Sequence, residues 1–242
     1  MTTADEPSIT LSHLHRADGS ATFSRNGFTV IGAVNGPLEV SRRDEIPDKA
    51  VVDVIIRPAV GSGDTRERYL ESILQSSLRQ IILVQDFPRS LIQITLQVID
   101  TPENDFSAQR GVRDISSLAL IPALIQTAIL SLLSASIPMI LTLTSIHISV
   151  QPTGSFTRII PNPSISQMLE AKSIHVLAFT SQGDLLLAES EGSFMMTEWN
   201  EIYNTGKQIC CEGDKGEGQS GSINHITSNI HSKISEELHW QQ

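Results

Sequence analysis

The stretch that most constrains this chain runs from Leu118 to Met139. It reads LALIPALIQTAILSLLSASIPM and is the most apolar part of the sequence. Pro122 suits the first turn of a helix, where a missing N–H costs nothing, and Pro138 marks the exit, which predicts a helical body of about 16 residues. A membrane span needs ~20 apolar residues, and serines, a threonine and a glutamine dilute this run further. We therefore expect a core helix that the rest of the fold covers on nearly all sides.

Composition narrows the class of protein. The 242 residues allow one large domain or two small ones. Asp5 and Glu6 fall where a signal peptide would be apolar, so none is expected. Cys210 and Cys211 are the only cysteines and are adjacent, which excludes a disulfide framework and favours a reducing intracellular compartment. The net charge of −10 disfavours a protein that coats nucleic acid alone, but it allows a local basic strip within an assembly.

Residue periodicity on both sides of the apolar stretch predicts a mixed fold. Hairpins are expected around Asn26-Gly27 and Gln182-Gly183, where turn dipeptides separate alternating segments. Further strands are predicted over 50–57, 90–100 and 141–150, and helices over 65–85, 194–209 and, more weakly, 223–240. The segment 101–114 is predicted to be a surface loop and 151–168 to be irregular, because both are polar or contain several prolines. This order of elements is typical of an α/β or α+β protein.

Motifs that carry chemistry are few. Gly216, Gly218 and Gly221 match G-x-G-x-x-G, but no strand precedes them, so a linker is the better interpretation. His13 and His15 lie two apart on a predicted strand without a third ligand, which disfavours a metal site. The cysteine pair lacks the two-residue spacer of a redox or zinc motif. Since there is also no nucleophile elbow, P-loop or H-E-x-x-H sequence, the motifs indicate no enzyme, no metal and no cofactor.

Arg66, Arg68 and Arg79 lie on the helix predicted over 65–85. The first two fall in its opening turn, where the helix dipole prefers carboxylates, so a phosphate ligand is one interpretation. Pairing with Glu67 and Glu71 is the other, because residues three apart on a helix are neighbours. The sequence alone leaves both open.

Several segments together resemble the ribonuclease PH family. In order they are ADGSA, GAVNGPLEV, VVDVIIRP, RERYLESILQSSLRQIIL, FPRSLIQITLQVI and the apolar helix ending SIPM, and they cover roughly residues 11–209. They look most like the ribonuclease-PH-like ring subunits of the eukaryotic RNA exosome. The resemblance implies an α+β ribonuclease-PH fold (ribosomal protein S5 domain 2-like), with β-sheets packed around a central apolar helix. We expect a flexible N-terminus over 1–10, one domain over 11–211, and a Gly/Ser linker with a possible C-terminal helix over 212–242.

Active members of this family are phosphorolytic exoribonucleases, and this sequence departs from them in both parts of their site. They bind phosphate with a G-S-R-T-like segment at the N-terminus of the central helix, a place that Ala119–Pro122 hold here. Their acidic segments resemble D-P and E-A-D, whereas this chain has Asn162-Pro163 and Glu170-Ala171-Lys172. An amide and an ammonium replace two carboxylates, and Glu170 alone is no catalytic set.

The resemblance therefore predicts a catalytically inactive, structural subunit of the exosome ring, which supports 3′–5′ RNA processing and degradation by helping to form the RNA-threading channel. It implies as partners other ribonuclease-PH-like ring subunits, cap subunits with S1 or KH domains, an associated hydrolytic nuclease, and RNA in the channel, with no membrane. Arg66, Arg68 and Arg79 are then the candidate RNA contacts. The expected location is the nucleus, nucleolus and cytoplasm. The alternative is an active phosphorolytic 3′–5′ exoribonuclease with a relocated site.

Overall fold

The computed structural model describes residues 7–42, 44–61, 63–101, 117–153 and 156–212, together with four single positions in the C-terminal segment. The chain divides into two compact units, Met1–Leu143 and Thr144–Gln242. Each unit has its own β-sheet with its own helices. The two units divide the range 11–211 for which one domain is expected, and that expectation stays a prediction.

The first unit is built on a five-stranded sheet. Its elements are β1 (Ser8–Leu11), β2 (Gly19–Arg25), β3 (Phe28–Glu39), β4 (Val51–Arg57), α1 (Thr65–Ile81), η1 (Val84–Asp86), β5 (Ser90–Asp100), η2 (Ser117–Leu120) and α3 (Ile121–Ser134). The strand order is β1-β2-β3-β5-β4, antiparallel except for the β4–β5 pair. Asn26 and Gly27 connect β2 to β3 with φ of 53° and 79°, the two positive angles of a type I′ turn, which confirms the predicted hairpin.

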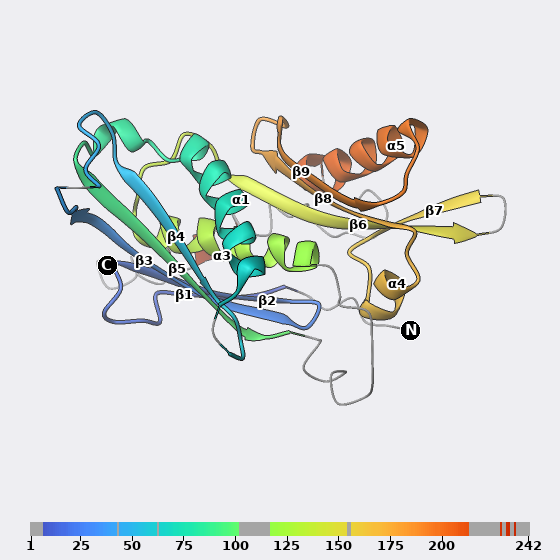
Figure 1. Cartoon of the computed structure of the whole chain (residues 1–242), viewed down its shortest axis with the longest axis horizontal. Helices are drawn as coiled ribbons and strands as arrows, with labels where there is room; N and C mark the ends of the chain where they lie inside the picture. Colours follow the sequence, from blue (N-terminus) through green and yellow to red (C-terminus); the bar gives the residue numbers. More distant parts are fainter. Residues whose placement is uncertain are drawn as a thin grey trace. The chain divides into compact units, whose positions relative to one another are not determined.

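One face of this sheet is apolar, because residues opposite each other on neighbouring strands point the same way. Val30 of β3 lies opposite Val98 of β5, and Val54 of β4 lies opposite Ile94 of β5, and all four are buried. The two helices α1 and α3 cover this face (Figure 1). The apolar side chains of the strands and helices therefore form a common core.

The apolar stretch forms the buried helix that the sequence predicts. Eleven of the 14 residues of α3 are buried. The segment Ser117–Ser134 is long and apolar enough to cross a membrane, but 72% of it is buried within the protein. Its polar residues are accommodated locally, since the Thr127 hydroxyl donates to Ala123 O at 2.7 Å and the Ser131 hydroxyl to Thr127 O at 2.8 Å.

Two glycines allow α3 to approach the sheet closely. A Cβ atom on Gly19 would lie 2.2 Å from Ala135 N and 2.5 Å from Ser131 O. A Cβ on Gly32 would lie 2.8 Å from Cγ2 of Thr127. Only glycine fits these two positions while the helix stays where it is.

The second unit has a four-stranded sheet of order β7-β6-β8-β9. Its elements are β6 (Leu143–Thr153), β7 (Phe156–Pro161), α4 (Ile165–Leu169), β8 (Ser173–Thr180), β9 (Leu185–Gly192), α5 (Met196–Lys207) and a π-helical turn (Gln208–Glu212). In its core, Ile202 of α5 packs with Ile148 of β6 and Phe179 of β8. Figure 1 shows α5 along this sheet.

Several predicted boundaries shift for physical reasons. The helix predicted over 65–85 ends at Ile81, because Ile82 is extended and forms a bridge with Met139. The apolar helix ends at Ser134, before Pro138, because Ser136 takes a left-handed conformation with φ of 55°.

Two predictions were wrong. The segment 151–168 is not irregular, since it contains the end of β6, all of β7 and most of α4; Pro161 ends β7 and Pro163 precedes the helix cap Ser164. His13 and His15 lie in the loop between β1 and β2 and not on a strand. The flexible N-terminus expected over 1–10 stays a prediction, because residues 1–6 lie outside the described residues; the last part of that range is β1, which begins at Ser8 and pairs with β2. Nearly all of the expected loop over 101–114, the Gly216–Gly221 motif and most of the possible C-terminal helix fall outside the described residues.

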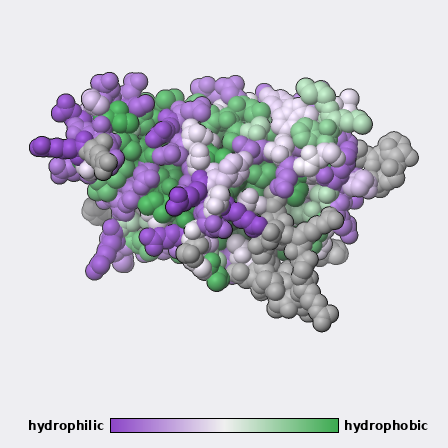
Figure 2. Space-filling model, in the orientation of Figure 1, coloured by the Kyte–Doolittle hydropathy of each residue, from purple (hydrophilic) through white to green (hydrophobic). Residues whose placement is uncertain are grey.

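The surface also carries exposed apolar side chains. Val60 and Ile140 of the first unit are 78% and 59% exposed, and Met195 and Met196 of the second are 68% and 72% exposed. Figure 2 shows green apolar areas between purple polar ones on one face of the molecule. Exposed apolar area of this kind is available for contact with another protein.

Candidate functional site

The first turn of α1 uses its acidic residues to bind backbone amides. Glu67 accepts a hydrogen bond from the N–H of the cap residue Asp64 at 2.7 Å, and Glu71 accepts one from Ile56 N–H of β4 at 2.8 Å. Among the described residues, no ion pair joins Arg68 to either carboxylate. Pairing of Arg68 with Glu67 or Glu71, one of the two interpretations open from the sequence, is therefore absent.

The three candidate arginines do not converge. All are exposed, and a helix turns by about 100° per residue, so Arg66 lies roughly 160° around α1 from Arg68. Arg79 is eleven residues beyond Arg68, which returns it to within about 20° of the same stripe, three turns further along. The structure thus places Arg68 and Arg79 on one side of α1 and Arg66 on the other.

Arg68 borders an open hollow of about 470 Å³ between α1 and β4. The charged side chains around it are those of Arg68 and four acids, Asp53, Asp64, Glu67 and Glu71. This excess of negative charge disfavours a phosphate within the hollow. Any contact of Arg68 with a phosphate would therefore be made on its outer, exposed side.

The first turn of the central helix is filled by apolar side chains. The chain enters α3 through η2, and Ala119 and Ile121 are only 2% and 0% exposed. The cap residue Leu120 makes no side-chain hydrogen bond to the helix. Free N–H groups at a helix start attract anions, but no glycine, hydroxyl or guanidinium lies within Ala119–Pro122 to complete such a site.

The positions that correspond to the acidic segments lie on either side of one stretch of β6. Asn162 follows β7 and donates its N–H to His147 O at 2.9 Å, while Lys172 precedes β8 and donates its N–H to Val150 O at 2.8 Å. Glu170 caps the C-terminal end of α4 and is exposed. These positions therefore carry an amide, a carboxylate and an ammonium.

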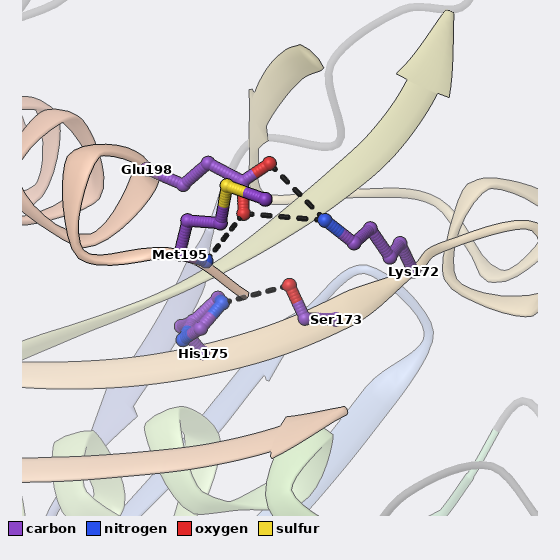
Figure 3. A network of polar contacts seen from close by, with 5 residues as sticks. All are labelled: Lys172, Ser173, His175, Met195 and Glu198. Carbon is purple, nitrogen blue, oxygen red and sulfur yellow. Dashed lines mark hydrogen bonds and ion pairs between the residues drawn. The ribbon is translucent and has the colours of Figure 1, made fainter. Parts of the chain in front are cut away.

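The ammonium of Lys172 is neutralised within the unit (Figure 3). Its Nζ lies 3.2 Å and 3.3 Å from the two carboxylate oxygens of Glu198. Glu198 also accepts the backbone N–H of Met195, at the cap of α5, at 2.8 Å. The side chains of Lys172 and Glu198 are 33% and 12% exposed, so this pair is partly shielded from water.

His175 lies beside this pair and was not singled out by the sequence. Its Nδ1 is 2.8 Å from Ser190 Oγ and its Nε2 is 2.9 Å from Ser173 Oγ, and the Phe194 ring meets it edge-on at 4.7 Å. Burial lowers the pKa of His175 from 6.5 to about 4, against a smaller opposing effect of Glu198. The imidazole is therefore neutral near pH 7 and holds two strands together. The sequence pattern that could have pointed to His175 is its spacing of two from Ser173 on a predicted strand, which puts both side chains on one face.

Comparison with known proteins identifies the family. Residues 6–138 match the 3′ exoribonuclease family, domain 1, which is the ribonuclease PH domain. Over 205 residues the chain is 33% identical to exosome complex component RRP46 of Saccharomyces cerevisiae, a match that covers 82% of this chain and 87% of that protein. The chain belongs to the ribonuclease PH family. This ribonuclease PH chain is also 35% identical over 124 residues to exosome complex component rrp46 of Schizosaccharomyces pombe, covering 51% of this chain and 49% of that protein.

Solved structures confirm the ribonuclease-PH fold. Rice (Oryza sativa) Rrp46 aligns with a TM-score of 0.73 at 22% identity, over 96% of both chains. A chain of the Archaeoglobus fulgidus exosome with RNA bound to the active site aligns with a TM-score of 0.63 at 14% identity, over 84% of this chain and 85% of that one. These structures confirm the predicted α+β fold, and the sequence relatives confirm the resemblance to exosome ring subunits.

The expectation of no metal site remains a prediction. Within the part of the chain that the structure describes, no three His, Cys, Asp or Glu side chains lie together as metal ligands would. His13 instead lies 3.2 Å from the Thr22 hydroxyl through its Nε2 atom.

Proposed function

We propose that this chain is a structural, catalytically inactive subunit of an exosome ring. The observation that carries the proposal is the first turn of α3, where Ala119 and Ile121 are buried and apolar at the place where active relatives are expected to hold phosphate. An anion at this position would lose its hydration without gaining a guanidinium or hydroxyl partner. Phosphorolysis needs phosphate as its nucleophile. Without a phosphate-binding site, this chain cannot hold the nucleophile in place for the reaction.

The acidic positions support the same conclusion. Active relatives are expected to use carboxylates at these positions for general acid–base or metal chemistry, whereas here Asn162 cannot ionise and Lys172 is held by Glu198. Glu198 is committed to Lys172 and to the α5 cap. It therefore does not replace the lost carboxylates.

The partners follow from the relatives, which are components of exosome complexes. We propose that this chain contacts other ribonuclease-PH-like ring subunits, and that the ring binds cap subunits with S1 or KH domains, a hydrolytic nuclease and RNA. Exposed apolar side chains such as Met195 and Met196 suit protein contacts of this kind. We also propose residence in the nucleus, nucleolus and cytoplasm, which imaging of the tagged full chain checks.

Inactivity is tested with single-stranded RNA and inorganic phosphate. The isolated full chain is expected to release no nucleoside diphosphate, while an active ribonuclease PH releases it under the same conditions. The double variant Asn162→Asp/Lys172→Asp should stay inactive, because the apolar turn of α3 is unchanged. Phosphate-dependent release of nucleoside diphosphate by the wild-type chain would contradict the proposal and favour a relocated active site.

Within the assembled ring, we propose that Arg68 and Arg79 contact RNA phosphates from their shared side of α1. Each single-stranded phosphate contact contributes about 0.7 to the slope of log affinity against log salt. Arg68→Ala and Arg79→Ala are each expected to reduce the slope by about that amount. Arg66→Ala, on the opposite side of the same helix, is the matched control. Unchanged slopes in both variants would exclude these arginines from the RNA path.

A further inference from the structure

β4 is one of the two edge strands of the five-stranded sheet, because only one of its sides pairs with another described strand, β5. Its sequence VVDVIIR is rich in β-branched residues and contains neither Pro nor Gly. Segments of this composition pair readily with further strands when their edge is open. Whether another strand can add to β4 therefore depends on the groups that lie next to it.

Two side chains of α1 bind the outward backbone groups of β4. Gln75 Nε2 donates to Val52 O at 2.6 Å, and Glu71 Oε1 accepts from Ile56 N–H at 2.8 Å. The N–H and C=O of one strand residue point to the same side, so Val52, Val54 and Ile56 all present these groups away from β5. An added strand would need the same groups that Glu71 and Gln75 occupy.

The two side chains are held firmly in place. Both are partly buried, and the neighbouring residues Leu70, Leu74 and Leu78 of α1 are 3%, 0% and 0% exposed. These leucines anchor α1 against the apolar face of the sheet. Glu71 and Gln75 lie one turn apart on α1. Their partners on β4, Ile56 and Val52, lie four residues apart, and the order is reversed because α1 and β4 run in opposite directions.

We propose that Glu71 and Gln75 close the β4 edge against a second copy of this chain. They take the hydrogen-bonding positions at which the β4 strand of another molecule would add. Val54 lies between their targets and lines the hollow beside α1, and an added strand could not bond Val54 without also meeting Glu71 and Gln75. Contacts with partner subunits are therefore made through surfaces other than β4.

Amide hydrogen exchange of the full-length chain tests the first step. In the wild type, Ile56 N–H should exchange at least about tenfold more slowly than an unbonded amide, because a hydrogen bond to a charged group protects it. Glu71→Ala should remove this protection, whereas Glu71→Gln should keep most of it, since the amide oxygen still accepts. Gln80→Ala changes an exposed residue of α1 whose side chain donates to Ser76 O of its own helix and, among the described residues, has no bond to β4, so this variant should change nothing. Equal Ile56 exchange in wild type and Glu71→Ala would overturn the proposal.

Self-association tests the second step. Light scattering should show the mass of Glu71→Ala/Gln75→Ala rising with concentration, while wild type and Gln80→Ala keep theirs. Protection of the Ile55 amide, which faces β5, reports whether β4 is still folded in the variant. A folded double variant with wild-type mass at every concentration would overturn the proposal; if the double variant unfolds, the single-variant exchange data decide it.

Discussion

At the scale of single residues, Lys172 and Glu198 explain how a cation is accommodated at a position where active relatives are expected to carry a carboxylate. Glu198 binds the ammonium and the Met195 N–H at once, so one carboxylate links the start of β8 to the start of α5. Because Lys172 is a third exposed, the pair itself contributes only about 0–1 kcal/mol.

His175 makes stability depend on pH. Burial lowers its pKa to about 4 in the folded chain from 6.5, so below pH 6.5 the unfolded chain binds a proton that the folded chain does not. The contribution of His175 is therefore fully present above pH 6.5 and is lost as pH falls toward 4. The free energy of unfolding, measured with urea, should fall by at most about 1.4 kcal/mol per pH unit in this window because of this group.

The variant His175→Gln isolates this effect. Glutamine keeps a donor and an acceptor between Ser173 and Ser190 but does not titrate. The variant should therefore lose less stability between pH 6.5 and 4 than the wild type. Parallel pH profiles for the two proteins would show that His175 is not the group responsible.

At the scale of secondary-structure elements, α3 shows what a sequence can and cannot reveal. Its length, burial and proline start follow from one apolar run, and the β2–β3 hairpin follows from Asn26-Gly27. The close approach of Gly19 to α3 depends on residues more than a hundred positions away, so no local pattern announces it. Likewise β7 and α4 are short and bounded by prolines, and local propensity alone favours a loop there.

In the candidate site, too, some features could be found from the sequence and others only from the structure. The importance of Ala119–Pro122, Asn162 and Lys172 came from resemblance to ribonuclease PH, since none of them forms a motif alone. The pairing of Lys172 with Glu198 needed the structure, because the two lie 26 residues apart on different elements. The binding of Glu71 to Ile56 N–H also needed it, because helix periodicity had suggested an arginine partner.

The contact between Gly19 and α3 gives a prediction for this element. Gly19→Ala places a Cβ atom against the backbone at Ala135 and Ser131, which cannot move without shifting the helix. We expect the free energy of unfolding to fall by about 3 kcal/mol, as for an overpacked core. Gly63→Ala is the matched control, since its nearest neighbour would be 3.9 Å away, and it should change stability by no more than about 0.5 kcal/mol. Similar losses in both variants, measured by urea unfolding, would contradict the close packing of α3.

At the scale of the whole molecule, two features bear on assembly. The net charge of −10 does not suit a chain that binds RNA alone, whereas a ring needs only a few arginines to meet phosphates. The β4 edge is bound by side chains of α1, while apolar residues such as Ile140 and Met196 remain exposed. These features favour assembly through side-chain surfaces with different partners over stacking of identical copies.

The central claim is that this ribonuclease PH chain works as a structural part of a ring. Its most direct test is the mass of the species formed when the full-length chain is mixed with its cognate ribonuclease-PH-like ring subunits, measured by light scattering or native mass spectrometry. We predict a hetero-oligomer of defined mass that contains this chain. A chain that stays separate from those subunits under all conditions would contradict the claim.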